Sequence, residues 1–143
     1  AIASIFLDGQ EVVSVVDRQG NKTVHKAGHG KLDIPLVVMV NGDSASASEI
    51  LAGALQDNKR ALLVGDKTYG KGLVQTVYPL GNGGALKLTT QKYFTPDGTD
   101  INEIGITPDF PVKNEANSEE DRQLQKALEI VKKQIAGPVS KAS

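Results

Sequence analysis

The sequence predicts an α/β fold, in which a βαβ unit is followed by an antiparallel hairpin and a C-terminal helix. Two short apolar runs, 35–40 and 61–64, flank a segment at 46–57 with the apolar spacing of an amphipathic helix. A short continuous apolar run is typical of a strand that is buried on both faces in a parallel sheet. Strand, helix and strand within about 30 residues form a βαβ unit, for which a right-handed crossover is expected.

The composition is that of an ordinary globular domain. The chain has 143 residues, of which 39% are hydrophobic and 23% are charged, and its net charge is −1. This length suffices for one domain with its own core, and the charge gives no electrostatic reason to expect nucleic acid as a partner. Without cysteine, the chain has no disulfide or thiolate site. No metal-ligand spacing is present either, so we expect neither a metal nor a cofactor.

The first third of the chain predicts the end of a helix and an exposed hairpin. Residues 1–7 are apolar and end before an Asp-Gly pair, as the last turns of a helix do. The β-branched run 11–17 and the segment 22–26 are separated by turn residues, which predicts a β-hairpin. His25 and His29 lie in no recognisable motif, and we expect both to be exposed rather than catalytic.

The second half predicts a longer hairpin and an amphipathic helix. Residues 73–80 and 85–94 are strand-like and are separated by a glycine-rich turn, whereas 101–112 contains two prolines and is expected to be irregular. The clearest helix of the chain is expected at 118–136, with Ser118 as its cap and a Gly-Pro pair after its last residue.

Ser46 and Lys71 are the candidate nucleophile and base. Ser46 stands after a buried strand at the expected start of a helix, where backbone amides can stabilise an oxyanion. With no suitable histidine, Lys71 is the candidate base of a Ser-Lys pair. Lysine acts as a base only when it is neutral, which requires burial that lowers its pKa. Gln75, four residues later, is expected on the same side of a strand, where its amide can orient the amine.

Simpler roles remain open for both residues. Ser46 and Glu49 match the S-x-x-E capping box, so Ser46 is also a candidate helix cap, and Lys71 is also a candidate solvated loop lysine. Residues 65–71 match the start of a phosphate-binding loop, G-x-x-x-x-G-K. Gly72 stands where that loop has Ser or Thr, and the segment that follows is strand-like, so we reject a nucleotide site.

Several segments together resemble the C-terminal processing peptidases, also called tail-specific proteases. The matching elements are SASASEI around Ser46, GKGLVQ around Lys71 and the 25 positions between these two residues. PLVVMVN before the serine and YFTPDGTDINEIGITPDFPV near the end follow in the same order and spacing. The resemblance covers residues 2–112.

The resemblance implies a role for each site residue. Ser46 is similar to the family's nucleophile, Lys71 to its general base and Gln75 to the residue that positions the lysine, and the Ala47 amide would be one oxyanion donor. The implied fold is related to the crotonase and Clp protease superfamily. The implied activity is a serine endopeptidase that cleaves protein substrates near their C-termini. The implied location is the bacterial envelope or periplasm, or the thylakoid lumen in plants.

Two features of the family are missing from the sequence. The family usually has a PDZ domain and a strand with a glycine pair, which supplies a second oxyanion amide, before the segment that matches here. We therefore expect residues 1–112 to be a partial catalytic core, followed by a linker and helix in 113–143, with weak or no activity alone. The alternatives are a ligand-binding or interaction module on the same fold, and a fragment that self-associates through surfaces exposed by truncation.

Overall fold

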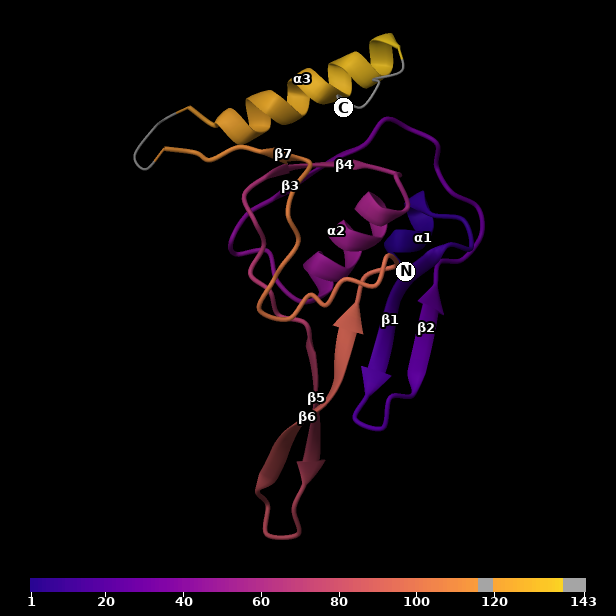
Figure 1. Ribbon diagram of the computed structural model, residues 1–143, viewed down its shortest axis with the longest axis vertical. Coiled ribbons are helices and arrows are strands. Elements are labelled where there is room, and N and C mark those ends of the chain that lie inside the picture. The colour runs from indigo at the N-terminus through magenta and orange to yellow at the C-terminus, as the bar shows by residue number, and fades with distance from the viewer. Residues whose placement is uncertain (116–119, 138–143) are drawn as a thin grey trace.

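The computed structural model describes residues 1–115 and 120–137, and it contains two sheets that pack around a central helix (Figure 1). The class is mixed α/β, as predicted, with an antiparallel sheet and a C-terminal helix. The elements in chain order are α1 (Ala3–Phe6), β1 (Glu11–Asp17), β2 (Lys22–Lys26), β3 (Val37–Val40), α2 (Ala47–Asp57), β4 (Leu62–Gly65), β5 (Leu73–Pro79), β6 (Ala85–Phe94), β7 (Phe110–Pro111) and α3 (Arg122–Ala136).

The predicted βαβ unit is present, since β3 and β4 pair in parallel and α2 connects them. The expectation that the first of these strands is buried on both faces is wrong. Val40 is buried but Met39 is 41% exposed, because β3 is an edge strand of the three-stranded sheet β3-β4-β7. The segment 101–112, expected to be irregular, contributes the two-residue strand β7, which pairs in parallel with β4.

The second sheet is antiparallel and has the strand order β2-β1-β6-β5. Both predicted hairpins, β1–β2 and β5–β6, are confirmed, and pairing of β1 with β6 joins them. The outer half of the β5–β6 hairpin projects from the body of the molecule (Figure 1). Its β5 strand begins directly after the loop that carries Lys71.

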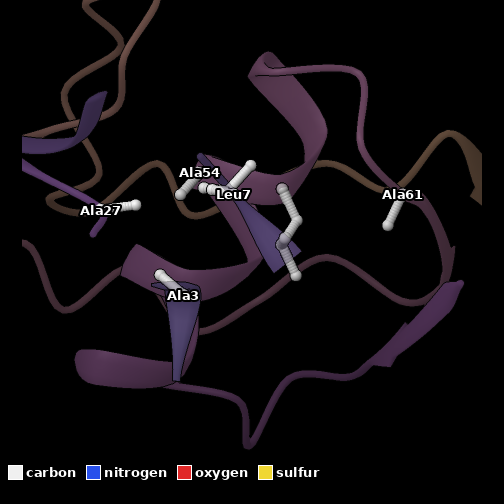
Figure 2. Close-up of a cluster of buried hydrophobic side chains, with 6 residues drawn as sticks. Ala3, Leu7, Ala27, Ala54 and Ala61 are labelled. Atoms are coloured by element: carbon white, nitrogen blue, oxygen red, sulfur yellow. The ribbon is translucent and has the colours of Figure 1, made fainter. Parts of the chain in front are cut away.

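Helix α2 packs against both sheets with small side chains. On one side, Ala54 and Leu55 meet the N-terminal part of the chain, where Figure 2 shows Leu7 and Ala54 close together among the small residues of this cluster. On the other side, Ala52 packs with Leu63 and Ile106. Because alanine adds little bulk, the helix lies close to its neighbours, and this fixes the position of its N-terminus.

Helix α3 covers the outer face of the three-stranded sheet. Ala127 and Ile130 pack against Val64 of β4. Among the described residues, no helix is both long and apolar enough to cross a membrane.

The start of α3 differs from the prediction. The helix begins at Arg122 and its N-cap is Asp121, whose Oδ1 accepts a hydrogen bond from Leu124 N–H at 2.9 Å, whereas Ser118 lies outside the described residues. The Leu124 amide, together with the side chain of Asn114, lowers the pKa of the Asp121 carboxyl. This cap therefore stabilises the fold at neutral pH, and its contribution is lost as the pH falls through the lowered pKa.

Arg60, just after α2, binds the N-terminal part of the chain. Its guanidinium donates hydrogen bonds to the carbonyl oxygens of Phe6 at 3.1 Å, Leu32 at 2.9 Å and Ile34 at 2.8 Å. It also lies over the Phe6 ring, 5.8 Å from the ring centre. One side chain therefore joins α1, the long loop before β3 and the end of α2.

We expect Arg60→Ala to lower the free energy of unfolding by about 2 kcal/mol, because three carbonyls lose a charged donor at a partly exposed site. Urea denaturation followed by circular dichroism measures this change. Arg18→Ala, in the exposed turn between β1 and β2, is the matched control and should change stability by less than about 0.5 kcal/mol. Equal effects of the two substitutions would contradict the assigned role of Arg60.

Candidate active site

A fully buried carboxylate, that of Glu49 in α2, is the centre of the site. Its Oε1 accepts hydrogen bonds from the Thr68 hydroxyl at 2.6 Å and from Gly70 N–H at 2.7 Å. Its Oε2 accepts from Ser46 N–H at 2.8 Å and from Lys71 N–H at 2.9 Å. Four donors match the acceptor capacity of an ionised carboxylate, which allows Glu49 to be buried with no cationic partner among the described residues.

This arrangement brings together the two residues that the sequence singles out. The backbone amides of Ser46 and Lys71 bind the same oxygen atom, although 25 positions separate them in the chain. Ser46 is half-buried, and Lys71 is exposed, so the described residues do not supply the burial that a neutral lysine needs. No hydrogen bond between Ser46 Oγ and Lys71 Nζ occurs in the part of the chain that the structure describes.

The backbone of Ser46 is in an unusual conformation for a helix cap. Its φ of 56° is positive, whereas a cap residue normally lies in the β region. Ser46 and Glu49 are arranged as a capping box. The Glu49 carboxylate accepts a hydrogen bond from Ser46 N–H, whereas the Ser46 hydroxyl makes no cap hydrogen bond of ordinary geometry. Helix capping does not require a positive φ at the cap residue. Backbone strain of this kind is concentrated at functional sites.

The helix that follows Ser46 provides an amide for an oxyanion. Ala47 is the first residue of α2, so its N–H has no partner within the helix. Ala47 is exposed, which leaves its amide open to a ligand. The role of the Ala47 amide as an oxyanion donor remains a prediction.

A second segment, residues 101–106, fixes the loop of Lys71 from the other side. Glu103 N–H donates to Gly70 O at 2.8 Å, and Thr68 N–H donates to Ile106 O at 3.1 Å. The Thr68 hydroxyl, which donates to Glu49, also accepts from Ile106 N–H at 2.7 Å. The loop is thus held between α2 and a segment that lies more than thirty positions later in the chain.

Gln75 is not placed as the alternation of a strand suggests. Lys71 precedes β5, and the register of β5 shifts between Val74 and Gln75, so the two side chains are not related by regular strand geometry. Gln75 is exposed, and within the described residues no hydrogen bond joins it to Lys71. The segment after Lys71 is a strand rather than a helix, which agrees with the rejection of a phosphate-binding loop.

The two histidines are exposed, as predicted, and lie apart from this site. His25 is in β2, and His29 Nδ1 lies 2.8 Å from Asp8 Oδ1. This hydrogen bond is the main cause of the lowered pKa of the Asp8 carboxyl. Among the described residues neither histidine is hydrogen-bonded to a serine, so the structure offers no Ser-His pair.

An open pocket of about 560 Å³ is lined by Lys71 and by Ala45, the residue before Ser46. Its lining comes from the loop before α2, the lysine loop and the 101–106 segment, namely Asp43, Ala45, Tyr69, Gly70, Lys71, Asn102 and Glu103. The pocket is therefore formed by the same segments that Glu49 and Thr68 hold together.

Comparison with known proteins identifies the family of this arrangement. The model of peptidase family S41 matches residues 1–112. The chain belongs to this family. A carboxyl-terminal-processing protease of Picosynechococcus sp. is 47% identical to this S41 chain over 150 residues, which cover 99% of the chain and 36% of that protein. The chloroplastic C-terminal processing peptidase of Tetradesmus obliquus is 45% identical over 116 residues, covering 80% of the chain and 25% of that protein.

Solved structures agree with this assignment. A photosystem II D1 C-terminal processing protease matches the S41 chain with a TM-score of 0.76 at 42% identity, covering 91% of the chain and 32% of that protein. A lipoprotein from Streptococcus agalactiae, 20% identical with a TM-score of 0.75, shares the fold. The chain spans 36% or less of the length of the two curated relatives.

Two features of the S41 site were not found from the sequence. Glu49 was noted only as part of a capping box, and its spacing from Ser46 does not reveal the three bonds to the lysine loop. The contact of Thr68 with Ile106 joins segments that are distant in the chain and carry no motif that links them.

We expect Glu49→Gln to lower the free energy of unfolding by about 2–3 kcal/mol, because an amide presents its own donors to buried N–H and O–H groups and leaves them unpaired. Urea denaturation measures the loss. Asp33→Asn removes an exposed carboxylate and serves as the control, with an expected change below about 0.5 kcal/mol. A Glu49→Gln chain as stable as this control would contradict the role of the carboxylate.

We expect Gly72→Ala to lower stability by about 1–3 kcal/mol and to displace Lys71, because a Cβ at this position would lie 2.3 Å from the Asn102 backbone nitrogen. Thermal unfolding and the backbone amide chemical shift of Lys71 report the two effects. Gly81→Ala is the control, since a Cβ there meets nothing within 4 Å. Unchanged shifts around Lys71 in the Gly72 variant would refute this account of the loop.

Proposed function

We propose that the chain carries the nucleophile and base of a serine endopeptidase that acts on the C-terminal tails of protein substrates. Ser46 is the nucleophile, Lys71 is the base, the Ala47 amide is one oxyanion donor and Gln75 positions the lysine. The observation that supports this proposal most strongly is the shared hydrogen-bond acceptor, Glu49 Oε2, which fixes the Ser46 and Lys71 amides beside each other.

In the proposed reaction, the neutral Lys71 amine takes the proton of the Ser46 hydroxyl while Oγ attacks the carbonyl carbon of the scissile peptide bond. The Ala47 amide stabilises the oxyanion of the tetrahedral intermediate. Collapse of the intermediate breaks the C–N bond, and the lysine ammonium returns its proton to the leaving amine. Water then attacks the acyl-serine ester by the same route and releases the shortened substrate.

Covering Lys71 is a necessary step in this mechanism. The amine is exposed and borders an open pocket, and a lysine in water remains charged. A substrate segment in the pocket would exclude water and favour the neutral amine. We expect the turnover of the chain to be weak, because Lys71 is exposed in the free chain. By analogy with its curated relatives, we place its action outside the cytoplasm, in the bacterial envelope or a chloroplast compartment.

We expect Ser46→Ala and Lys71→Met each to abolish the slow cleavage of an unfolded protein substrate by the chain, since each removes a reacting group. Intact-mass spectrometry of the products over time measures the rate. Ser48→Ala, two positions along on exposed helix surface, is the matched control and should retain activity.

Turnover that persists in Ser46→Ala, or that is lost equally in Ser48→Ala, would overturn the proposal. In that case the ligand-binding module on the same fold becomes the better explanation.

A further inference from the structure

The chain contains two Asn-Gly pairs, and asparagine before glycine is chemically the most labile asparagine in a polypeptide. The backbone nitrogen of the glycine attacks the side-chain carboxamide of the asparagine, and the absence of a Cβ leaves that nitrogen open to the approach. Asn82 lies in the turn of the β5–β6 hairpin. Asn41 lies in the loop between β3 and α2 that leads to Ser46, so a reaction there would alter the candidate active site.

The two pairs differ in the state of the glycine nitrogen. Gly83 N–H donates a hydrogen bond to Leu80 O at 3.1 Å. Gly42 N–H makes no hydrogen bond in the part of the chain that the structure describes. An amide that is bound to a carbonyl oxygen has to break this bond before its nitrogen can attack another group. The nitrogen after Asn41 is therefore the one that is available for reaction.

The carboxamide of Asn41 is held in a position that favours the attack. Its Oδ1 accepts hydrogen bonds from Asp43 N–H at 3.1 Å and from the Ser44 hydroxyl at 3.3 Å. Donors at this oxygen stabilise the negative charge that develops on it when the carbon is attacked. The bond to Asp43 N–H also folds the side chain over the Asn41–Gly42 peptide, which brings Cγ toward the Gly42 nitrogen.

The backbone itself does not require glycine at position 42. The φ of Gly42 is not in the left-handed region, and a Cβ there would meet Lys67 O at an ordinary distance of 3.9 Å. Asn41 and Gly42 are exposed, and Asn41 lines an open pocket of about 340 Å³ whose walls are mostly polar side chains. Water therefore has access to this peptide bond, and Gly42→Ala is a variant that should fold.

We propose that Asn41 and Gly42 form a self-modification site, at which the chain converts Asn41 to isoaspartate and disrupts the Ser46 loop. The Gly42 nitrogen gives up its proton and bonds to Asn41 Cγ, while the C–NH₂ bond breaks and ammonia leaves with that proton. Water then opens the cyclic imide by adding OH to a carbonyl carbon and H to the ring nitrogen. Opening at the former main-chain carbonyl gives isoaspartate, and opening at Cγ gives aspartate.

Isoaspartate would disturb the contacts that join this loop to the lysine loop. Its main chain runs through Cβ and Cγ, which lengthens the backbone by a carbon atom, and the former main-chain carbonyl becomes a carboxylate. Ser44 N–H donates to that carbonyl oxygen of Asn41 at 3.0 Å, and Ser44 O accepts from Tyr69 N–H at 3.0 Å. A shift at Asn41 thus reaches both Ser46 and the loop of Lys71. Its effect on cleavage rests on the proposed function, whereas the modification itself does not.

Peptide mapping by mass spectrometry of the folded chain, after long incubation in warm neutral buffer, tests the modification. Water enriched in heavy oxygen labels each new carboxyl group, and electron-transfer fragmentation separates isoaspartate from aspartate. We expect isoaspartate as the main product at Asn41, formed faster there than at Asn82. In urea the two sites should react at similar rates, because the contacts around Asn41 are lost.

A matched variant shows whether the Gly42 nitrogen is the attacking group. Gly42→Ala places a Cβ beside this nitrogen and should slow the reaction at Asn41 by at least about tenfold, with no change at Asn82. An undiminished rate at Asn41 in this variant overturns the proposal. So does a rate at Asn41 that does not exceed the rate at Asn82, or a difference between the two sites that persists in urea.

The effect on the site is measured on chains separated by ion exchange, since the modification adds a negative charge. We expect the isoaspartyl form to cleave an unfolded protein substrate at least about tenfold more slowly, because a small displacement of reacting groups has a large effect on rate. Asn41→Asp adds the charge without lengthening the main chain, and it should retain activity, as should a chain modified at Asn82. The amide chemical shift of Tyr69 should change in the isoaspartyl form and not in Asn41→Asp.

The outcomes separate this inference from the proposed function. If isoaspartate forms at Asn41 and the Tyr69 shift changes, but no form of the chain cleaves substrate, the modification site stands and the peptidase proposal fails. If cleavage depends on Ser46 but Asn41 stays intact, or the isoaspartyl form cleaves at the original rate, the peptidase stands and this inference fails.

Discussion

The four hydrogen bonds accepted by the Glu49 carboxylate are the constraint on which the site depends. Glu49 projects from the first turn of α2, and α2 is fixed by small side chains packed against both sheets. A carboxylate buried without a cation is tolerable only when its oxygens are saturated with donors, so the loop that carries Thr68, Gly70 and Lys71 has to close against the helix. The helix and the lysine loop therefore stabilise each other. Since Oε2 also binds Ser46 N–H, the same group holds the backbone of Ser46 in its strained conformation.

The lysine loop also depends on close backbone packing that only small residues allow. Residues 101–106 pass so near the loop that a Cβ on Gly72 would approach the Asn102 nitrogen to 2.3 Å. The Thr68 hydroxyl joins the two sides, donating to Glu49 and accepting from Ile106 N–H. The position of Lys71 is thus fixed through its backbone, while its side chain stays in the open pocket.

The elements that local sequence specifies were predictable, and the contacts between distant segments were not. Apolar runs and turn residues gave β1, β2, β5, β6 and α2 nearly to the residue, because periodicity and glycine are local signals. The exposure of Met39 could not be foreseen, since it depends on β3 being an edge strand. Ser46 and Lys71 were singled out as candidates from residue type and spacing, but the burial expected for Lys71 is not present in the described chain. The bulge before Gln75 and the saturation of Glu49 both arise from tertiary contacts that one sequence does not display.

The exposure of Lys71 and the openness of the pocket beside it can be understood together. Lys71 is exposed in the free chain, whereas the proposed base has to be covered before it can act. A substrate segment in the pocket that Lys71 borders would displace water there. Chemistry at Ser46 would then depend on the arrival of the substrate. Binding of the substrate and activation of the base become consequences of the same contact.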